Sequence, residues 1–231
     1  MTINTVRHHE VFDSSKYSNM GVVVVGGGAI GSRVIENLAS TGLTNLTLID
    51  PDKVESHNLA NQLYLREDIG VPKVVAAKRW CYAKLGEDAA EQIRFIEGWV
   101  DEHSLGWFTD ATIVISCVDT FKARAIVMQM ARDAWASLFI EAGMATQHIN
   151  VFMVDPDNSI DVKAWEETLG DDDDPSYETS ACGESLSVGV TAQVAGAVIA
   201  WQVMNYMKTG YMEKKIRVDT TPFMIGRHSQ R

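Results

Sequence analysis

The chain has 231 residues, of which 46% are hydrophobic, and a formal net charge of −11. This length and composition are typical of a globular protein with one large core, and they argue against disorder. The acidic balance argues against broad nucleic-acid binding, which needs a basic surface to neutralise phosphates. Apolar runs are short and interrupted, and the N-terminus has no apolar segment of the secretory type. We therefore predict neither a membrane span nor export.

The three cysteines, Cys81, Cys117 and Cys182, are odd in number and far apart in the sequence. This pattern argues against a disulfide framework. The chain also has no CxxC pair of the kind that binds structural zinc, so no structural zinc is expected. A reducing cytoplasm is the natural setting for such a protein.

Strand and helix patterns alternate through roughly the first 145 residues. Buried strands are expected from runs of apolar and β-branched residues, and helices from apolar residues at helical spacing. Such alternation predicts a Rossmann-like, doubly wound, mostly parallel sheet. The expected strands lie at residues 21–25, 44–50, 91–100, 111–118 and 137–144, and the expected helices at 29–42, 71–86 and 120–136.

The alternation stops in the last third of the chain. A strand is expected at 147–155 with no helix after it, and residues 156–184 read as a long polar crossover loop with one helical turn. Residues 185–210 predict one long helix whose alanines and glycines indicate tight packing. One or two final strands are expected at 214–226. No linker divides the sequence, so residues 1–231 are predicted to form a single domain.

Three glycines form the pattern G-x-G-x-x-G between the first strand and the first helix. In the dinucleotide fingerprint, Gly26 would allow a tight turn, Gly28 would let backbone N–H groups approach phosphates, and Gly31 would let helix and strand pack closely. Ala29 and Ile30 lie in the same loop, at the helix N-terminus that would face the anion. A glycine turn that serves packing alone is the alternative.

The second strand ends at Asp50, 19 residues after Gly31, where a carboxylate can hold a ribose hydroxyl. The fingerprint alone is more typical of NAD than of ATP. However, the next dozen residues are rich in carboxylates and amides, which suit a nucleotide whose phosphates are cleaved with the help of a metal. A capped helical turn with solvated amides would also explain them. The polar residues concerned are Asp52, Asn58, Asn61 and Gln62.

Four ordered motifs, "GGGAIGS", "LIDPDKVESHNLANQ", "EDIGVPKVVA" and "SCVDTFKAR", resemble the ThiF/MoeB/HesA family of bacterial E1-like adenylyltransferases. The resemblance is strong over residues 20–145 and weaker over the late loop and long helix. It implies the E1-like fold, in which antiparallel strands extend the Rossmann-like sheet at its C-terminal end.

The resemblance also implies roles for individual residues. Asp50 would hold the ATP ribose, while Asn58 and Lys73 would contact the phosphates. Asp119 would bind the catalytic Mg²⁺, and Arg124 would line the same pocket. Taken singly, Lys73 could instead be a solvated helix lysine and Asp119 a helix N-cap.

Two positions depart from the family pattern. Asn61 stands where the family has an arginine that binds the triphosphate, and Thr120 stands where it has an asparagine. Asparagine removes a full charge and a bidentate donor. Either another cation compensates, with Arg33, Arg66 and Arg124 as candidates, or the protein is a weak or inactive relative.

Cys182 lies at the end of the crossover loop, where relatives carry a cysteine that takes an acyl or sulfur group. A thiol near a helix N-terminus tends toward the reactive thiolate. A plain loop or packing cysteine is the alternative, and the acids at 171–174 would oppose the thiolate. Cys81 and Cys117 are interpreted as core residues.

The resemblance implies an ATP- and Mg²⁺-dependent adenylyltransferase that activates the C-terminal carboxylate of a small ubiquitin-like or sulfur-carrier protein. Transfer of the acyl group or of sulfur at Cys182 would follow. Lys73, Asp119 and Cys182 are then the candidate catalytic residues, and relatives are often homodimers. Three alternatives stay open: a nucleotide-binding adaptor with weakened catalysis, an E1-like enzyme for a peptide or tRNA substrate, and an NAD-dependent oxidoreductase.

Overall fold

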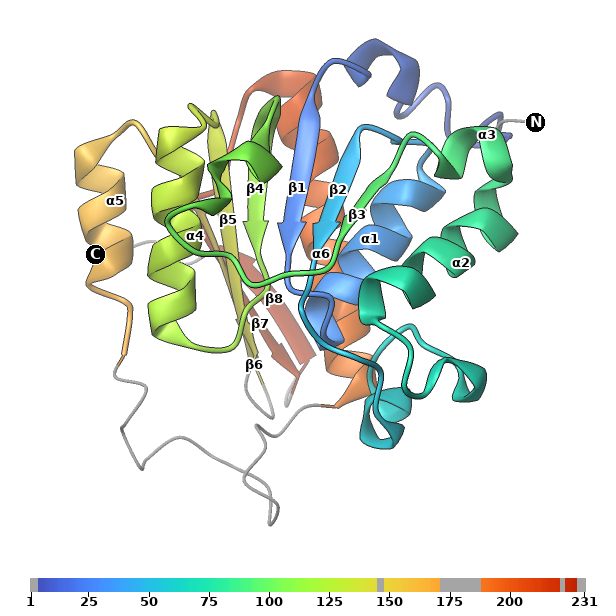
Figure 1. The fold of residues 1–231 in the computed structure, drawn as a ribbon. Coiled ribbons are helices and arrows are strands. Elements are labelled where there is room, and N and C mark those ends of the chain that lie inside the picture. The colour runs from blue at the N-terminus through green and yellow to red at the C-terminus, as the bar shows by residue number, and fades with distance from the viewer. Residues whose placement is uncertain (1–3, 145–147, 171–187, 221–222, 228–231) are drawn as a thin grey trace.

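An eight-stranded sheet, in the order β3-β2-β1-β4-β5-β6-β7-β8, forms the centre of the molecule (Figure 1). The computed structural model describes residues 4–144, 148–170, 188–220 and 223–227. Pairing is parallel from β3 to β5 and antiparallel from β5 to β8, which confirms the predicted fold class. The strands are β1 (Gly21–Val25), β2 (Leu46–Ile49), β3 (Arg94–Ile96), β4 (Ala111–Ser116), β5 (Leu138–Met144), β6 (His148–Val154), β7 (Lys215–Thr220) and β8 (Phe223–Arg227).

Helices cover both faces of this sheet. Helices α1, α2 and α6 pack on one face, and α4 and α5 on the other. In the described residues, no helix has the length and hydrophobicity needed to cross a membrane. The α-helices are α1 (Ala29–Ser40), α2 (Lys73–Leu85), α3 (Glu87–Ala90), α4 (Phe121–Asp133), α5 (Ser159–Glu166) and α6 (Gly189–Thr209); the 3₁₀ turns are η1 (Ser14–Tyr17), η2 (Ser56–Ala60), η3 (Arg66–Asp68) and η4 (Ser104–Phe108).

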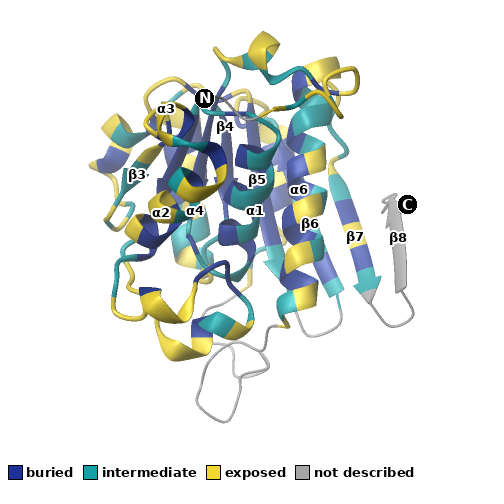
Figure 2. Ribbon diagram, turned by 90° about the vertical axis from the view of Figure 1, so that its right-hand side faces the viewer, coloured by how far each residue is buried: buried dark blue, intermediate teal, exposed yellow. Residues whose placement is uncertain are grey.

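The central strands are mostly apolar because both of their faces are buried, and Glu141 on β5 is a charged exception (Figure 2). In β1, Val22 and Val24 join the core beneath α1 and α6, whereas Val23 and Val25 join the core beneath α4. The parallel ladders then bring the carboxyl ends of β1, β2 and β4 to one edge of the sheet. Ligands of open α/β sheets bind outside this edge.

The long helix α6 packs tightly on α1, as its small residues predicted. A Cβ on Gly196 would lie 2.5 Å from the Cβ of Arg33 and 2.9 Å from its carbonyl carbon. A Cβ on Gly189, in the first turn of α6, would lie 2.6 Å from the carbonyl oxygen of Ala60. The glycines therefore seat α6 against both α1 and the segment that follows β2.

The prediction of a polar loop with one helical turn after β6 is wrong for its first part. Helix α5 has eight residues and begins at Ser159; the side chain of its N-cap residue, Asn158, accepts hydrogen bonds from the backbone N–H groups of Ile160 and Asp161. Trp165 anchors the helix by packing edge-on against Phe139, with ring centroids 5.2 Å apart. Residues 171–187, including Cys182, lie outside the described part of the chain.

Candidate nucleotide site

The glycine loop has the geometry that the sequence predicted. Gly26 has a φ of +92°, and a Cβ there would lie 2.7 Å from the carbonyl oxygen of Cys117. At Gly31 a Cβ would lie 1.8 Å from the carbonyl oxygen of Gly26, so helix and strand approach too closely for a side chain. At Gly28 no heavy atom of the described residues lies within 4 Å of the Cβ position, so this part of the chain leaves the loop open on that side.

Helix α1 begins at Ala29, directly after this open position. The first N–H groups of a helix have no partner within the helix, and they suit an anion. Ile30 is 8% exposed and belongs to the core beneath α1 and α6. Its backbone, not its side chain, is therefore the part that could face a phosphate.

Asp50 is buried at the end of β2 and is tied to the glycine loop. Its Oδ2 accepts a 2.6 Å hydrogen bond from the backbone N–H of Gly27, and its Oδ1 accepts a 2.8 Å bond from that of Asp52. Burial raises the pKa of Asp50, while Lys73 and the two backbone donors oppose that rise. The carboxylate thus orients the loop and retains further lone pairs for a hydroxyl.

Lys73 is 7% exposed, so it is not a solvated helix lysine. Its Nζ lies 2.9 Å from Oδ2 of Asp52 and 4.0 Å from Oδ1 of Asp50. A hydrogen bond from its backbone N–H to the carbonyl oxygen of Asp52 also fixes the start of α2. The structure therefore brings together Lys73, Asp50 and Asp52, three residues that were predicted to share a site.

Tyr64 supports this cluster and was not among the predicted site residues. Its hydroxyl donates a 2.6 Å hydrogen bond to the carbonyl oxygen of Gly27, and the residue is 5% exposed. Burial, with the neighbouring carboxylates, raises its pKa well above the ordinary value, so the hydroxyl stays a donor. No local sequence pattern predicts this contact, because 37 residues separate the two partners.

The amide side chains after β2 help to build the loop. The Oδ1 of Asn58 accepts a 2.8 Å hydrogen bond from the backbone N–H of Glu55, which caps η2. Asn61 follows as the C-cap residue of η2. Gln62 is buried, and its Oε1 has no hydrogen-bond partner in the described part of the chain. Asn58 thus caps the turn, but its amide is buried at 5% exposure and not solvated, and its contact with phosphates stays a prediction.

Asp119 is exposed on the turn between β4 and α4. The turn contacts the glycine loop, because the Gly26 Cβ position lies against the carbonyl oxygen of Cys117 and the backbone N of Val118. The N-cap of α4 is Thr120, whose hydroxyl accepts from the N–H of Ala123 at 3.2 Å. The helix-capping role considered for Asp119 therefore belongs to its neighbour, and the Asp119 carboxylate is left at the surface beside the loop.

Two of the three arginines considered as replacements for the family arginine have partners within the fold. Arg33 donates to Glu36 at 2.8 Å and to the carbonyl oxygen of Gln62 at 3.0 Å. Arg124 is paired with Glu141 at 3.0 Å. Arg66 is exposed in η3. Compensation for Asn61 by any of them stays a prediction.

Cys81 is a core thiol, as predicted, whereas Cys117 is half-buried and packs against the core. Burial raises the pKa of Cys81 to about 12. Burial, reinforced by the Glu141 carboxylate, raises the pKa of Cys117 to about 12 as well. Both are protonated at neutral pH and therefore unsuited to nucleophilic attack.

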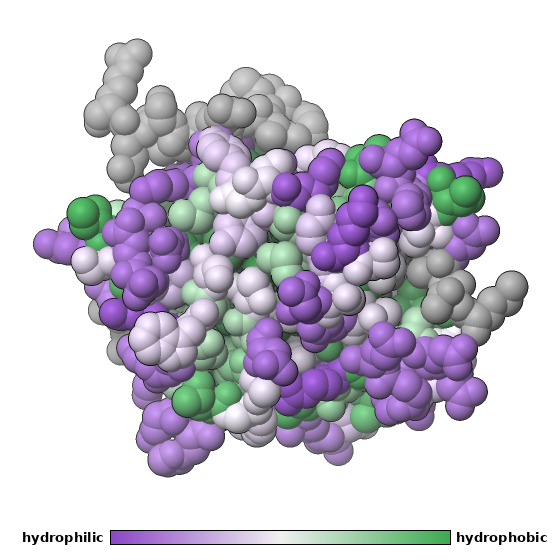
Figure 3. Space-filling model, turned by 90° about the horizontal axis from the view of Figure 1, so that it is seen from above, coloured by the Kyte–Doolittle hydropathy of each residue, from purple (hydrophilic) through white to green (hydrophobic). Residues whose placement is uncertain are grey.

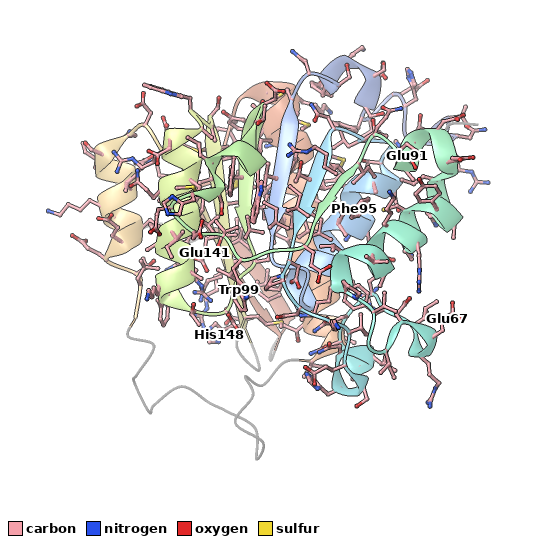
Figure 4. All side chains as sticks on the ribbon, in the orientation of Figure 1. Glu67, Glu91, Phe95, Trp99, Glu141 and His148 are labelled. Carbon is pink, nitrogen blue, oxygen red and sulfur yellow. The ribbon has the colours of Figure 1, made fainter. Side chains whose placement is uncertain are left out.

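Trp99 is a further candidate that the sequence reasoning missed. The N–H of Gly98 donates to the carbonyl oxygen of Asp50 at 3.3 Å. This bond joins the segments that follow β2 and β3, and Trp99 is the next residue. Its side chain is 75% exposed at the carboxyl edge of the sheet (Figure 4). An exposed aromatic ring beside a candidate ribose site can stack on a base.

The donors at this edge fit a magnesium ion that also binds phosphate oxygens. Mg²⁺ is usually held by one or two carboxylates together with substrate phosphates and water. Asp119 supplies an exposed carboxylate beside the glycine loop, and Asp52 is half exposed at 51%. Across the described residues, no three His, Cys, Asp or Glu side chains gather into a metal site.

A polar hollow of about 340 Å³ lies at the opposite, amino edge of the sheet. It is lined by the N-terminal segment, including His9 and Asp13, and by residues 42–45. Figure 3 views the molecule from that side, where hydrophobic residues form small patches among polar ones. Because parallel sheets bind nucleotides at their carboxyl edge, this hollow is not the nucleotide site.

Comparisons with known proteins agree with this geometry. The chain is 32% identical over 168 residues to the ubiquitin-like modifier-activating enzyme 5 of Caenorhabditis elegans, covering 61% of this chain and 40% of that protein. It is 32% identical over 109 residues to the sulfur carrier protein adenylyltransferase of Thermus thermophilus, covering 46% and 39%. This chain thus spans less than half the length of either relative.

The fold matches that of Escherichia coli MccB in a structure with ATP, with a TM-score of 0.67 and 20% identity, covering 93% of this chain and 65% of MccB. The model of the ThiF family matches residues 5–226. These findings confirm the resemblance drawn from the four sequence motifs: the chain belongs to the ThiF family.

Proposed function

We propose that this chain is an ATP-dependent adenylyltransferase that activates the C-terminal carboxylate of a small ubiquitin-like or sulfur-carrier protein. The observation that carries the proposal is the cluster of Lys73, Asp50 and Asp52 against an open glycine loop. Membership of the ThiF family and the adenylyltransferase among its relatives support the same chemistry.

In the proposed reaction, a carboxylate oxygen of the carrier attacks the α-phosphorus of ATP. The bond from that phosphorus to the bridging oxygen breaks, and the products are an acyl-adenylate and pyrophosphate. Negative charge grows on the phosphate oxygens as the bond breaks. Lys73 and the N–H groups at the start of α1 would stabilise this charge, because prearranged donors act strongly at a site shielded from water.

Asp50 would bind the ribose hydroxyl, and Asp119 would hold Mg²⁺ together with phosphate oxygens. Magnesium, when bound, would neutralise part of the charge on the leaving pyrophosphate. Because Lys73 is already paired with Asp52, nucleotide binding would have to draw its ammonium group partly toward the phosphates. The exposure of Asp52 permits this, since water can solvate the carboxylate that is left.

The thiolate of Cys182 would attack the acyl carbon of the adenylate, breaking its bond to the phosphate oxygen, so that a thioester forms and AMP leaves; delivery of sulfur is the alternative role. A homodimer is the proposed assembly. The peptide and tRNA substrates remain alternatives for the same adenylation chemistry. The substitution at Asn61 favours a second candidate, a nucleotide-binding adaptor with weakened catalysis.

ATP–pyrophosphate exchange tests the proposal. The chain is incubated with ATP, Mg²⁺, labelled pyrophosphate and a panel of small proteins ending in Gly-Gly. We expect exchange with one carrier, loss of exchange in Lys73→Met, and unchanged exchange in Lys78→Met, whose lysine is exposed on the same helix. ATP binding without exchange would favour the adaptor, whereas binding of NAD in place of ATP would contradict both.

A further inference from the structure

Arg124 points into the fold with all three of its guanidinium nitrogens engaged. Its Nη1 lies 3.0 Å from Oε1 of Glu141. Its Nε donates to the carbonyl oxygen of Val118 at 3.2 Å, and its Nη2 donates to that of Asp119 at 3.4 Å. The side chain is only 15% exposed. Arg124 therefore contacts two successive carbonyl groups of the turn that carries the candidate metal ligand.

Glu141 is the charged partner of Arg124. It lies on β5 and is 2% exposed, between the sheet and α4 (Figure 4). Its register partner on β4 is Ser116, the last residue of that strand before the turn. A buried carboxylate needs a partner because its desolvation is costly, and Arg124 supplies the opposite charge. Burial raises the pKa of Glu141, and the Arg124 guanidinium opposes that rise.

The turn is held from its other side by the glycine loop. The carbonyl oxygen of Cys117 touches the Cβ position of Gly26, and the N–H of Cys117 donates to the carbonyl oxygen of Val25 at 2.8 Å. The backbone before Asp119 is thus clamped between Gly26 and Arg124. Without the contact to Glu141, the long Arg124 side chain would lose the fixed charge that orients its guanidinium.

We propose that Glu141 is a positioning residue, which holds Arg124 so that Arg124 fixes the turn of residues 117–120 and thereby places the Asp119 carboxylate at the nucleotide site. This inference rests on the proposed function for its catalytic consequence. It assigns Arg124 a role in building the turn, where the family resemblance implied a place in the pocket lining.

Hydrogen–deuterium exchange of the full chain tests the positioning without requiring activity. Glu141→Gln keeps the size of the side chain and removes its charge. We expect amide exchange in residues 117–124 to become about tenfold faster, since the turn opens more readily once its anchor is lost. Glu166→Gln is the matched control, because Glu166 is an exposed glutamate on α5. Wild-type protection of the turn in Glu141→Gln would overturn the proposal.

The catalytic consequence is measured by the magnesium dependence of ATP–pyrophosphate exchange. In Glu141→Gln we expect the half-saturating Mg²⁺ concentration to rise about tenfold, which corresponds to about 1.4 kcal/mol of Mg²⁺ binding free energy. ATP binding without Mg²⁺ should be unchanged. If Arg124→Lys raises the half-saturating Mg²⁺ concentration to a similar degree, the double variant with Glu141→Gln should show little further increase. Additive losses would overturn the linkage between the two residues.

Arg124→Lys keeps the test decisive if Glu141→Gln does not fold. This variant retains the buried charge pair but loses the two contacts with the carbonyl oxygens of Val118 and Asp119. Amide hydrogen exchange in residues 117–124 should therefore become faster in it as well. Failure of the wild-type chain to catalyse pyrophosphate exchange would refute the proposed function alone, since turn protection is measured independently. The wild-type chain could instead catalyse pyrophosphate exchange while the variants keep wild-type protection of the turn and wild-type Mg²⁺ dependence. That result would refute the role of Glu141 alone.

Discussion

Replacing Lys73 by methionine should destabilise the fold at neutral pH through Asp50. The ammonium group lies 4.0 Å from Oδ1 of Asp50, whose side chain is 4% exposed. At an effective dielectric constant of about 20, two charges at that distance interact by about 4 kcal/mol. Asp52 contributes less because its half-exposed carboxylate is screened by water. Since breaking a buried pair leaves one charge without a partner, we expect a loss of about 3 kcal/mol in the free energy of unfolding.

The pH dependence identifies the cause. Burial already raises the pKa of Asp50 above its ordinary value of 3.8, and loss of Lys73 must raise it further. A carboxyl group with a raised pKa binds its proton more tightly in the folded state. Its contribution to stability is full below pH 3.8 and is lost as the pH rises through the raised value. The defect of Lys73→Met should therefore shrink as the pH falls from 7.5 to 5.

Urea unfolding, followed by tryptophan fluorescence at both pH values, measures this defect. For a chain of this size, about 3 kcal/mol corresponds to a midpoint shift of about 1 M. Lys78→Met is the control because Lys78 is exposed on the same helix. Wild-type stability of Lys73→Met at pH 7.5, or a defect of the same size at pH 5, would refute the reasoning.

The remaining predictions concern the loop and the exposed aromatic ring. Gly31→Ala should lower the melting temperature strongly, because its Cβ would lie 1.8 Å from a carbonyl oxygen, whereas Gly28→Ala should leave it unchanged and weaken ATP binding measured by calorimetry. Equal melting temperatures of Gly31→Ala and Gly28→Ala would contradict this expectation. Tyr64→Phe should lower the free energy of unfolding by about 1 to 2 kcal/mol, since it leaves the buried carbonyl oxygen of Gly27 without its donor. An unchanged midpoint of urea unfolding would count against a stabilising role of this hydrogen bond. Trp99→Ala should weaken ATP binding by about tenfold without affecting tripolyphosphate binding, whereas Trp135→Ala should change neither; equal losses for both ligands would exclude base stacking.

The sequence was sufficient where local chemistry decides structure. The glycine spacing predicted the turn: Gly26 has a positive φ, and a Cβ at Gly31 would lie 1.8 Å from the carbonyl oxygen of Gly26, whereas Gly28 borders the side that the described residues leave open. The doubly wound order followed from alternating patterns of buried strands and helices. The additional helix α5 was missed because its polar sequence hid a buried Trp165, whose contact is with a distant strand.

The site could be predicted only in part, because its contacts join residues far apart in the chain. The burial of Lys73 depends on how α2 meets the end of β2, which no local pattern encodes. The pairing of Glu141 with Arg124 depends in the same way on β5 lying beside β4. Sequence motifs thus predicted the candidate nucleotide site, whereas the contacts among its residues required the fold.

The most direct test of adenylation follows an oxygen atom. A carrier protein with an ¹⁸O-labelled C-terminal carboxylate is incubated with the chain, ATP and Mg²⁺. Hydroxylamine is then added; it attacks the acyl carbon of the activated carrier and releases the phosphate-bearing leaving group. Attack of the carboxylate on the α-phosphorus predicts that the released AMP carries one ¹⁸O atom. Label in inorganic phosphate, with ADP as the other product, would show attack on the γ-phosphorus and would contradict the proposed reaction.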